Sequence, residues 1–254
     1  MPVIAVFNQK GGVGKTTTAL NLGAALAARN RRPLLVDLDP QSSLSLSLGL
    51  RAVAPSDSVY AFFRDSTRLS SLARAQLSGM RVVPSSLELS KVDALHGSDA
   101  AISRRLKEGL QADLALAGDL ILIDCCPMLG VLTLNALIAA DRVLMPVAAD
   151  YLSLEGVQKL DAALGVLEER LGKHFLRRVV ITRFDARRRL SYEIQRQLDA
   201  RFSGTLCQTV ISETVSLAES PMHGKDIFAH APHSQGAKDY QALTEELDAG
   251  NFFR

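Results

Sequence analysis

The sequence predicts an α/β protein with a doubly wound, mostly parallel sheet that carries helices on both faces. Short apolar runs alternate with longer helical patterns along the 254 residues. Several of these apolar runs are continuous, which is typical of parallel strands buried on both faces. A glycine-rich loop joins the first apolar run to the first helical pattern. We expect a single domain over residues 1–254, because this length suits one sizeable α/β domain and is too short for two.

The predicted elements follow each other in order along the chain. Strand-like runs lie at 3–7, 34–38, 81–83, 120–124, 143–147, 178–182 and, more weakly, 208–211. Helical patterns lie at 16–29, 100–117, 131–139, 154–171, 189–201 and 236–248. Residues 42–79 are harder to assign, and 42–48 alternate like a strand. The pair Phe252-Phe253 follows acidic residues and is interpreted as a tail rather than a membrane anchor.

Composition limits the environment in which the protein works. The net charge is only +2 and 47% of the residues are hydrophobic, an ordinary globular balance. No apolar run approaches the roughly 18 residues that a membrane span needs. Three cysteines, two of them adjacent, do not form a disulfide framework, which favours a reducing compartment. We therefore expect a cytoplasmic protein that makes no use of a membrane.

Residues 8–18 predict a phosphate-binding loop, because they lie between a strand and a helix and are rich in glycine. The glycines let successive N–H groups point at an anion, and the helix adds its positive N-terminal end. Lys15 is placed to reach the β- and γ-phosphates, and Thr16 to ligate Mg²⁺. Gln9 stands where the general pattern has glycine. The residues expected to contact the nucleotide here are Lys10, Gly11, Gly12, Val13, Gly14, Lys15, Thr16 and Thr17.

A second lysine, Lys10, lies five residues before Lys15. One lysine is enough to hold phosphate within a subunit, so Lys10 would either crowd its own site or reach a neighbour's nucleotide. The alternative is a solvated residue at the end of the strand.

Three aspartates complete the candidate site. Asp124 follows four apolar residues and so lies at the carboxyl end of a strand, where it can accept from a Mg²⁺-bound water; it could also cap the next helix. Asp37 and Asp39 lie on the same side of an extended segment that Pro40 ends. Asp39 is our candidate for positioning the attacking water.

Between Arg170 and Arg201 there are ten Lys or Arg residues against three acids. The triplet Arg187-Arg188-Arg189 is the densest part of this stretch, and we select it as a candidate DNA-binding surface. The alternative interpretation is an ordinary solvated helix face.

Taken together, these motifs resemble the ParA/MinD family of deviant Walker A ATPases, most closely the small ParA (Soj-like) partition ATPases. Further matches follow in family order over about residues 2–247. They are Leu34–Gln41, Leu120–Asp124, Leu132–Leu137, Asp150–Gly156, Gly224-Lys225 and His230–Pro232. The resemblance implies a P-loop NTPase fold of the deviant Walker A type, ATP and Mg²⁺ as cofactors, and ATP hydrolysis. It also suggests a loop and short helix where 42–48 alternate.

The resemblance also implies roles for single residues. Lys10 matches the signature lysine that contacts the partner subunit's nucleotide across a dimer, so Lys10, Lys15 and Asp39 are the expected catalytic residues. The residue matching Asp39 serves hydrolysis, and the one matching Asp37 is near the metal; the expected metal set is therefore Thr16, Asp37 and Asp124.

The sequence departs from the family pattern in two segments. Cys126 and Met128 replace a proline and a serine near the γ-phosphate. Ser212, Glu213, Thr214 and Ser216 replace the usual Pro, Arg, Asn and Arg, so the adenine contacts expected from Ser212 and Thr214 are partly remade and one DNA-contact position is lost. Arg187 matches a DNA-contact arginine that is retained.

The leading hypothesis is an ATPase that forms a homodimer on ATP, binds double-stranded DNA without sequence preference and is nucleoid-associated. A ParB-like or adaptor partner would stimulate hydrolysis and so drive partition of chromosome or plasmid DNA. The alternative is a ParA-like positioning switch for a protein cargo, such as a chemotaxis cluster, polar organelle or secretion apparatus. A MinD-like membrane switch is disfavoured because the C-terminal residues 237–254 are mainly acidic.

Overall fold

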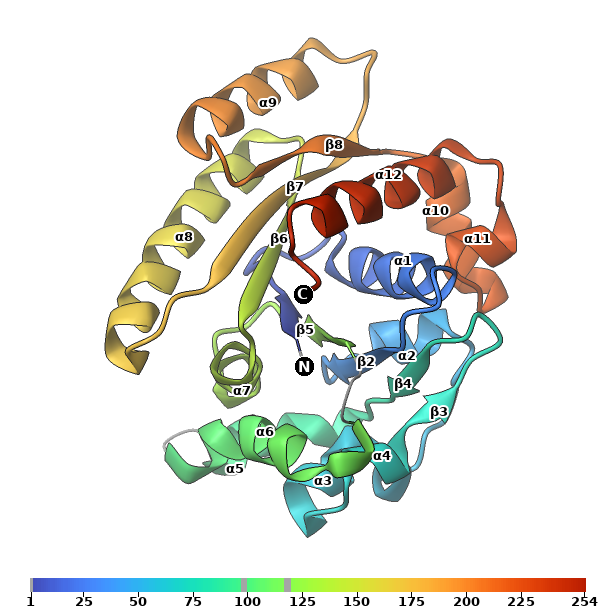
Figure 1. Cartoon of the computed structure of the whole chain (residues 1–254), viewed down its shortest axis with the longest axis vertical. Helices are drawn as coiled ribbons and strands as arrows, with labels where there is room; N and C mark the ends of the chain where they lie inside the picture. Colours follow the sequence, from blue (N-terminus) through green and yellow to red (C-terminus); the bar gives the residue numbers. More distant parts are fainter. Residues whose placement is uncertain (1, 97–99, 117–119) are drawn as a thin grey trace.

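The computed structural model describes residues 2–96, 100–116 and 120–254, and within them it contains one eight-stranded sheet (Figure 1). Its strand order is β3-β4-β2-β5-β1-β6-β7-β8. All neighbours pair in parallel except β3 and β4, which confirms the mostly parallel sheet. The strands are β1 (Val3–Val6), β2 (Pro33–Leu38), β3 (Arg74–Ala75), β4 (Arg81–Val83), β5 (Leu120–Cys125), β6 (Arg142–Ala148), β7 (Leu176–Phe184) and β8 (Leu206–Ser212).

Helices cover both faces of this sheet, as predicted. Side chains of α1, α2 and α10–α12 share one core with the sheet, and those of α3–α9 share the other. Figure 1 shows α1 and α12 side by side on one face, with α7 and α8 on the opposite face. None of the helices in the described part of the chain has the length and apolar character needed to cross a bilayer. The helices are α1 (Lys15–Ala27), α2 (Ser43–Ser47), α3 (Val59–Asp65), α4 (Leu69–Leu72), α5 (Ser90–His96), α6 (Ala100–Ala112), α7 (Val131–Ala139), α8 (Tyr151–Leu171), α9 (Arg189–Arg201), α10 (Val215–Glu219), α11 (Ile227–His230) and α12 (Gln235–Ala249).

The continuous apolar runs of the central strands are explained by these two cores. In β1, Ile4 packs into the core beneath α1, whereas Val3 and Ala5 pack into the core beneath α7 and α8. Successive side chains of a strand point to opposite faces, so a strand covered on both sides needs an apolar residue at every position.

The segment 42–48 is not a strand, although its residues alternate. Residues Ser43–Ser47 form α2, which agrees with the short helix that the family resemblance suggested. The Asp37 carboxylate accepts hydrogen bonds from the Ser45 N–H at 2.9 Å and from the Ser45 hydroxyl at 2.6 Å. These contacts tie the short helix to the end of β2, so tertiary contact decides the structure here rather than local pattern.

The C-terminal pair Phe252-Phe253 is not a tail, and this interpretation was wrong. Both side chains are buried in the core beneath α1 and α12. Arg31 donates a hydrogen bond to the Phe253 carbonyl at 2.7 Å, which holds the end of the chain in place. The acidic residues before the pair lie on α12, which packs on α1.

We expect Phe252→Ala to lower the free energy of unfolding by about 3–5 kcal/mol, the usual cost of removing a buried phenyl group. Leu77→Ala is the control, because Leu77 is fully exposed and its truncation leaves no cavity. Urea denaturation followed by circular dichroism measures both. Equal midpoints for the two variants would contradict the buried position of Phe252.

Candidate functional site

The glycine-rich loop lies between β1 and α1, as predicted, and its backbone is held by contacts from β7. Gly12 and Gly14 have φ angles of 75° and 83°, in the left-handed region that side chains disfavour. The Thr182 hydroxyl donates to the Val13 carbonyl at 2.8 Å. Lys15 is the first residue of α1, so the loop amides and the helix N-terminus face the same cavity.

Lys15 lies across this loop. Its side chain is buried, and its Nζ donates to the Lys10 carbonyl at 2.9 Å. Burial lowers the pKa of Lys15, and the nearby Asp124 carboxylate partly opposes that effect. The ammonium is therefore desolvated, and its hydrogen-bond partner among the described residues is an uncharged carbonyl, an arrangement that favours a bound anion.

Asp124 and Asp37 are neighbours on adjacent strands, where their Cα atoms pair in the β2–β5 register. Both carboxylates are buried. Burial, followed by the charge of Asp37, raises the pKa of Asp124 well above its usual value. Burial also raises the pKa of Asp37 to about 6, although hydrogen bonds from Ser45 oppose it. The Lys15 ammonium partly opposes the rise in the pKa of Asp124.

The Asp124 carboxylate has one free oxygen. Thr16 donates its hydroxyl to Asp124 Oδ2 at 2.8 Å, whereas Asp124 Oδ1 has no hydrogen-bond partner among the described residues. A buried carboxylate oxygen without a donor is costly and points to a group that the protein itself does not supply. A hard divalent cation with its water shell fits the oxygens of Thr16 and Asp124.

Unlike Asp124, Asp37 has a hydrogen-bond donor at each carboxylate oxygen. One of its oxygens accepts from Ser45, and the other accepts from the Asp39 N–H at 3.2 Å. The structure thus places Asp37 beside the candidate cation site, with both oxygens engaged in shaping the end of β2. Among the described residues there is no cluster of three or more His, Cys, Asp or Glu side chains that could hold a metal ion.

Asp39 and Lys15 both line the cavity. Asp39 Oδ1 accepts from the Gln41 N–H at 2.9 Å, which fixes the carboxylate at the start of the loop after β2.

Lys10 is turned away from the cavity. Its Nζ lies 2.6 Å from Asp150 Oδ1 and donates to the Ser153 hydroxyl at 2.9 Å. Asp150 is also the N-cap of α8, which explains why that helix begins at Tyr151, three residues before the predicted start. Burial pushes the pKa of Asp150 up, but hydrogen bonds from Lys10 and Ser153 bring it below its usual value. The Lys10 ammonium is therefore bonded to residues of its own chain, at a half-exposed position.

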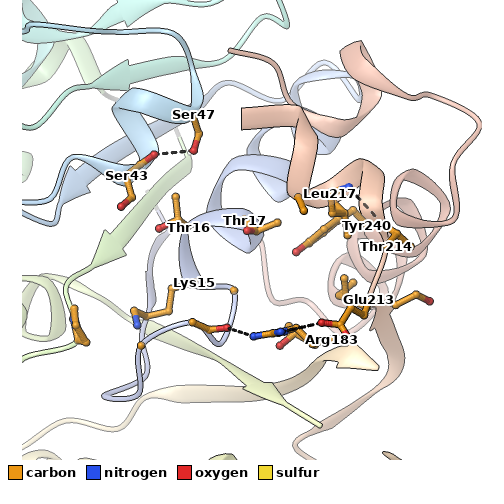
Figure 2. Close-up of a pocket in the computed structure, with 18 of the residues that line it drawn as sticks. Lys15, Thr16, Thr17, Ser43, Ser47, Arg183, Glu213, Thr214, Leu217 and Tyr240 are labelled. Carbon is orange, nitrogen blue, oxygen red and sulfur yellow. Dashed lines mark hydrogen bonds and ion pairs between the residues drawn. The ribbon is translucent and has the colours of Figure 1, made fainter. Parts of the chain in front are cut away.

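The cavity has a volume of about 500 Å³ and extends from the loop to the segment after β8 (Figure 2). Ser212 and Thr214, from which adenine contacts are expected, line it. The Ser212 N–H donates to Asp239 at 2.8 Å, and Thr214 caps α10. The two departures near the loop lie differently: Cys126 is buried against Thr133, whereas the Met128 side chain is exposed.

The structure adds cavity residues that the sequence did not indicate. Arg183 donates to Glu213 Oε1 through Nε at 3.1 Å and Nη2 at 2.9 Å, and Nη1 lies 3.5 Å from the Gly12 carbonyl. Figure 2 shows this guanidinium between the glycine loop and Glu213. The other additions are Ser43, Ser47, Pro127, Thr182, Ile211, Leu217, Ala218 and Tyr240. They come from several separate segments of the chain, so no local sequence pattern predicts that they meet at one cavity.

The arginine triplet lies where β7 leads into α9, and its charge is partly paired. Arg187 makes two hydrogen bonds of 2.9 Å to Asp185, and Arg188 lies 3.1 Å from the same carboxylate. Hydrogen bonds from Arg187 hold the pKa of Asp185 below its usual range. Arg189 is exposed at the first turn of α9. Arg177, by contrast, is largely buried and paired with Asp161 and Glu168, so the basic stretch does not form one continuous face.

A glycine loop between a strand and a helix, facing two strand-end aspartates in a parallel sheet, defines a P-loop nucleotide-binding protein. A family model described as an AAA domain matches residues 1–176. The chain is 36% identical over 249 residues to the sporulation initiation inhibitor protein Soj of Bacillus subtilis, covering 97% of this chain and 98% of that protein. It is 41% identical over 249 residues to the chromosome-partitioning ATPase Soj of Thermus thermophilus, covering 97% and 95%.

A solved structure agrees with this assignment. The cobyrinic acid a,c-diamide synthase of Mycobacterium smegmatis, with bound ADP and magnesium, matches with a TM-score of 0.84 and 30% identity. The match covers 99% of this chain and 96% of that one. The chain belongs to the ParA/MinD family of deviant Walker A ATPases and is similar to its small Soj-like members.

Proposed function

We propose that this protein is an Mg²⁺-dependent ATPase that dimerises on ATP and positions DNA within the cell. The observation that carries the proposal is the cavity lined by the glycine loop and Asp39, with Asp124 bonded to Thr16 of that loop and one Asp124 oxygen without a donor among the described residues. Titration calorimetry with ATP and Mg²⁺, followed by a phosphate-release assay, tests it. Absence of both binding and release would contradict the assignment.

In this proposal the loop binds the phosphates and the strand ends prepare hydrolysis. The loop amides and Lys15 neutralise the β- and γ-phosphates, so Lys15 exchanges the Lys10 carbonyl for phosphate oxygens. Thr16 and Asp124 hold the cation directly or through water, and Asp37 keeps the end of β2 in place. Bound Mg²⁺ supplies positive charge beside the β- and γ-phosphates. Asp39 orients the attacking water.

Lys10 is proposed to act on the partner subunit's nucleotide. Its present bonds to Asp150 and Ser153 lie at a half-exposed position, where a phosphate of another subunit could replace them. Its departure would also leave the Asp150 carboxylate, the N-cap of α8, without this cation. Dimerisation therefore couples the nucleotide of one subunit to the conformation of the other.

We expect Lys10→Ala to bind ATP with unchanged affinity but to lose ATP-dependent dimerisation or hydrolysis, because its charge is needed only in the assembled dimer. Size-exclusion chromatography with light scattering and a phosphate-release assay measure the two effects. Lys159→Ala, at an exposed lysine on α8, is the matched control. Normal dimers with normal turnover in Lys10→Ala would assign that lysine to the surface alone.

Double-stranded DNA is the proposed ligand of Arg187, Arg188 and Arg189. Binding to DNA would place the protein on the nucleoid. The support is the exposed position of all three side chains at one end of α9. Dimerisation doubles this basic surface, so the ATP-bound dimer should bind duplex DNA more strongly than the monomer. A ParB-like or adaptor partner is proposed to stimulate hydrolysis and so release the DNA.

Replacing the three arginines together by glutamate should abolish DNA binding while ATP binding is kept. The parent's affinity for non-specific duplex should fall steeply with salt, since each neutralised phosphate releases counterions. A triple change of exposed Arg51, Arg68 and Arg104 to glutamate controls for net charge. A gel-shift titration at low salt decides the question, and equal loss in both triple variants would contradict a specific patch.

The second candidate is a positioning switch for a protein cargo. The observation that favours it is the acid beside the triplet: Asp185 pairs with Arg187 and Arg188, and Glu213 lies 3.9 Å from Arg188. These carboxylates reduce the charge available to a phosphate backbone. If the ATP-loaded parent does not bind duplex DNA, this candidate takes first place.

A further inference from the structure

A second cavity, of about 320 Å³, lies beside the candidate nucleotide site and shares a wall with it. It is lined by residues 40–42, 50, 52, 53 and 85–88, together with Leu46 of α2. Ser43 and Ser47 of the same helix line the nucleotide cavity, and Figure 2 shows both on the side of α2 that faces it. The two cavities are thus separated by one helix of five residues.

The walls of this second cavity combine apolar contact surface with unused polar groups. Leu46 and Leu87 are 46% and 67% exposed, and Leu50 and Val53 are half-buried between them. The Ser85 hydroxyl is buried and has no hydrogen-bond partner among the described residues. Glu88 is the single charged residue among those described as lining the cavity, and no ion pair of its carboxylate is found there. A complementary ligand needs an apolar group, a hydrogen-bonding group and a positive charge.

The cavity is connected to the hydrolytic residues by short bonds. On one wall, the Ser42 N–H donates to the Asp39 carbonyl at 2.8 Å, and the Gln41 N–H donates to the Asp39 carboxylate. Ser42 has a φ of 55°, a left-handed conformation that stores strain in a residue other than glycine. A group that contacts this wall therefore acts on a segment that ends at Asp39.

The opposite wall is linked to the second aspartate. The Ser85 N–H donates to the Ser45 hydroxyl at 2.9 Å, and that hydroxyl donates to Asp37 at 2.6 Å. The three residues belong to the end of β2, to α2 and to the segment after β4. A displacement of the 85–88 segment would therefore act on α2, whose Ser43 and Ser47 line the nucleotide cavity.

We propose that this cavity receives a segment of a partner protein that presents one apolar side chain next to a lysine or arginine, and that its occupation stimulates hydrolysis through Asp39. The apolar side chain packs among Leu46, Leu50 and Leu87, and the basic group pairs with Glu88. The segment's backbone or side chain supplies the missing partner of Ser85. The inference rests on the proposed ATPase function and adds where the stimulating partner docks and by what chemistry.

Selection of a random peptide library displayed on phage against the immobilised full chain tests the docking site and does not require the partner protein itself. We expect enriched peptides to pair an apolar residue with a lysine or arginine. Leu87→Glu should weaken their binding at least about tenfold, which corresponds to roughly 1.4 kcal/mol. Leu77→Glu, the same change at an exposed leucine outside both cavities, should leave the affinity unchanged. No enriched peptide, or peptides insensitive to Leu87→Glu, would overturn the proposal.

Two further measurements distinguish a peptide that docks at Glu88 and stimulates hydrolysis from one that only sticks to the protein surface. Glu88→Lys should reverse the charge preference, so that peptides with glutamate in place of the basic residue bind better than the originals. A saturating peptide should raise ATP turnover of the parent, by about fivefold or more, and leave that of Leu87→Glu unchanged. Peptides that bind but do not change turnover, or that only block dimerisation, would contradict the coupling to Asp39.

The tests of the docking site and of the proposed ATPase function can give different outcomes. Leu87→Glu should keep the parent's basal ATP binding and turnover, because Leu87 lines neither the glycine loop nor its cavity. Peptide binding is measured without nucleotide, so it reports on the docking site even if the parent fails to hydrolyse ATP.

Discussion

Lys15→Ala is expected to weaken ATP binding on the order of a hundredfold or more, because truncating one partner of a desolvated charge pair costs about 2–5 kcal/mol. Lys15 is buried beside Asp124, and its ammonium has the Lys10 carbonyl as its hydrogen-bond partner. The remaining loop amides cannot offset the phosphate charge alone. Titration calorimetry with ATP and Mg²⁺ gives the affinity.

The control for this variant is its own folding. Circular dichroism of the variant should match that of the parent, which would show that the loss of ATP affinity is not a loss of fold. Lys225→Ala, at an exposed lysine outside the cavity, should bind ATP normally. A folded Lys15→Ala protein with the parent's affinity for ATP would refute the assignment of the loop.

Asp39→Ala is expected to bind ATP and dimerise but to lose about 10²–10⁴-fold in turnover. Asp39 lines the cavity, its carboxylate accepts a hydrogen bond from the Gln41 N–H, and it forms no ion pair with the residues that the structure describes. An interaction made mainly in the transition state affects kcat more than ground-state binding. Single-turnover phosphate release measures the effect.

Asp199→Ala is the matched control, because Asp199 is exposed on α9 and lies outside the cavity. It should retain the parent's turnover. Phosphate release by Asp39→Ala at the parent rate would remove Asp39 from the mechanism and direct attention to other groups around the same cavity.

The parts of the site that could be predicted from sequence are those that are local in the chain. The glycine loop is flanked by the strand and helix that position it, and the end of β5 places Asp124 at the edge of the sheet. A parallel sheet brings the carboxyl ends of its strands together, so Asp37 and Asp124 could be expected to meet. That Asp37 and Asp124 lie close together follows from the topology of the sheet alone.

What could not be predicted depends on contacts between distant segments. Arg183 on β7 and Glu213 after β8 meet near the glycine loop only because those strands are adjacent in the sheet. Lys10 could be recognised as unusual, but its bond to Asp150 requires the start of α8 to lie beside the loop. Such pairings leave no periodic signal in the sequence.

The two segments whose local pattern was misleading have the same explanation. The alternation over 42–48 is typical of a strand, but hydrogen bonds from Ser45 to Asp37 stabilise one short helix instead. The acidic residues before Phe252 suggested a solvated tail. They lie on α12, which packs with the two phenyl rings in the same core.

ATP, rather than ADP, is proposed to bring two copies of this chain together. Light scattering on Asp39→Ala, separated by size exclusion with ATP and Mg²⁺ or with ADP and Mg²⁺, is the sharpest test because slow turnover preserves the ATP state. We expect the mass of two chains with ATP and of one chain with ADP. The same mass with both nucleotides, while ATP is shown to be bound, would contradict it.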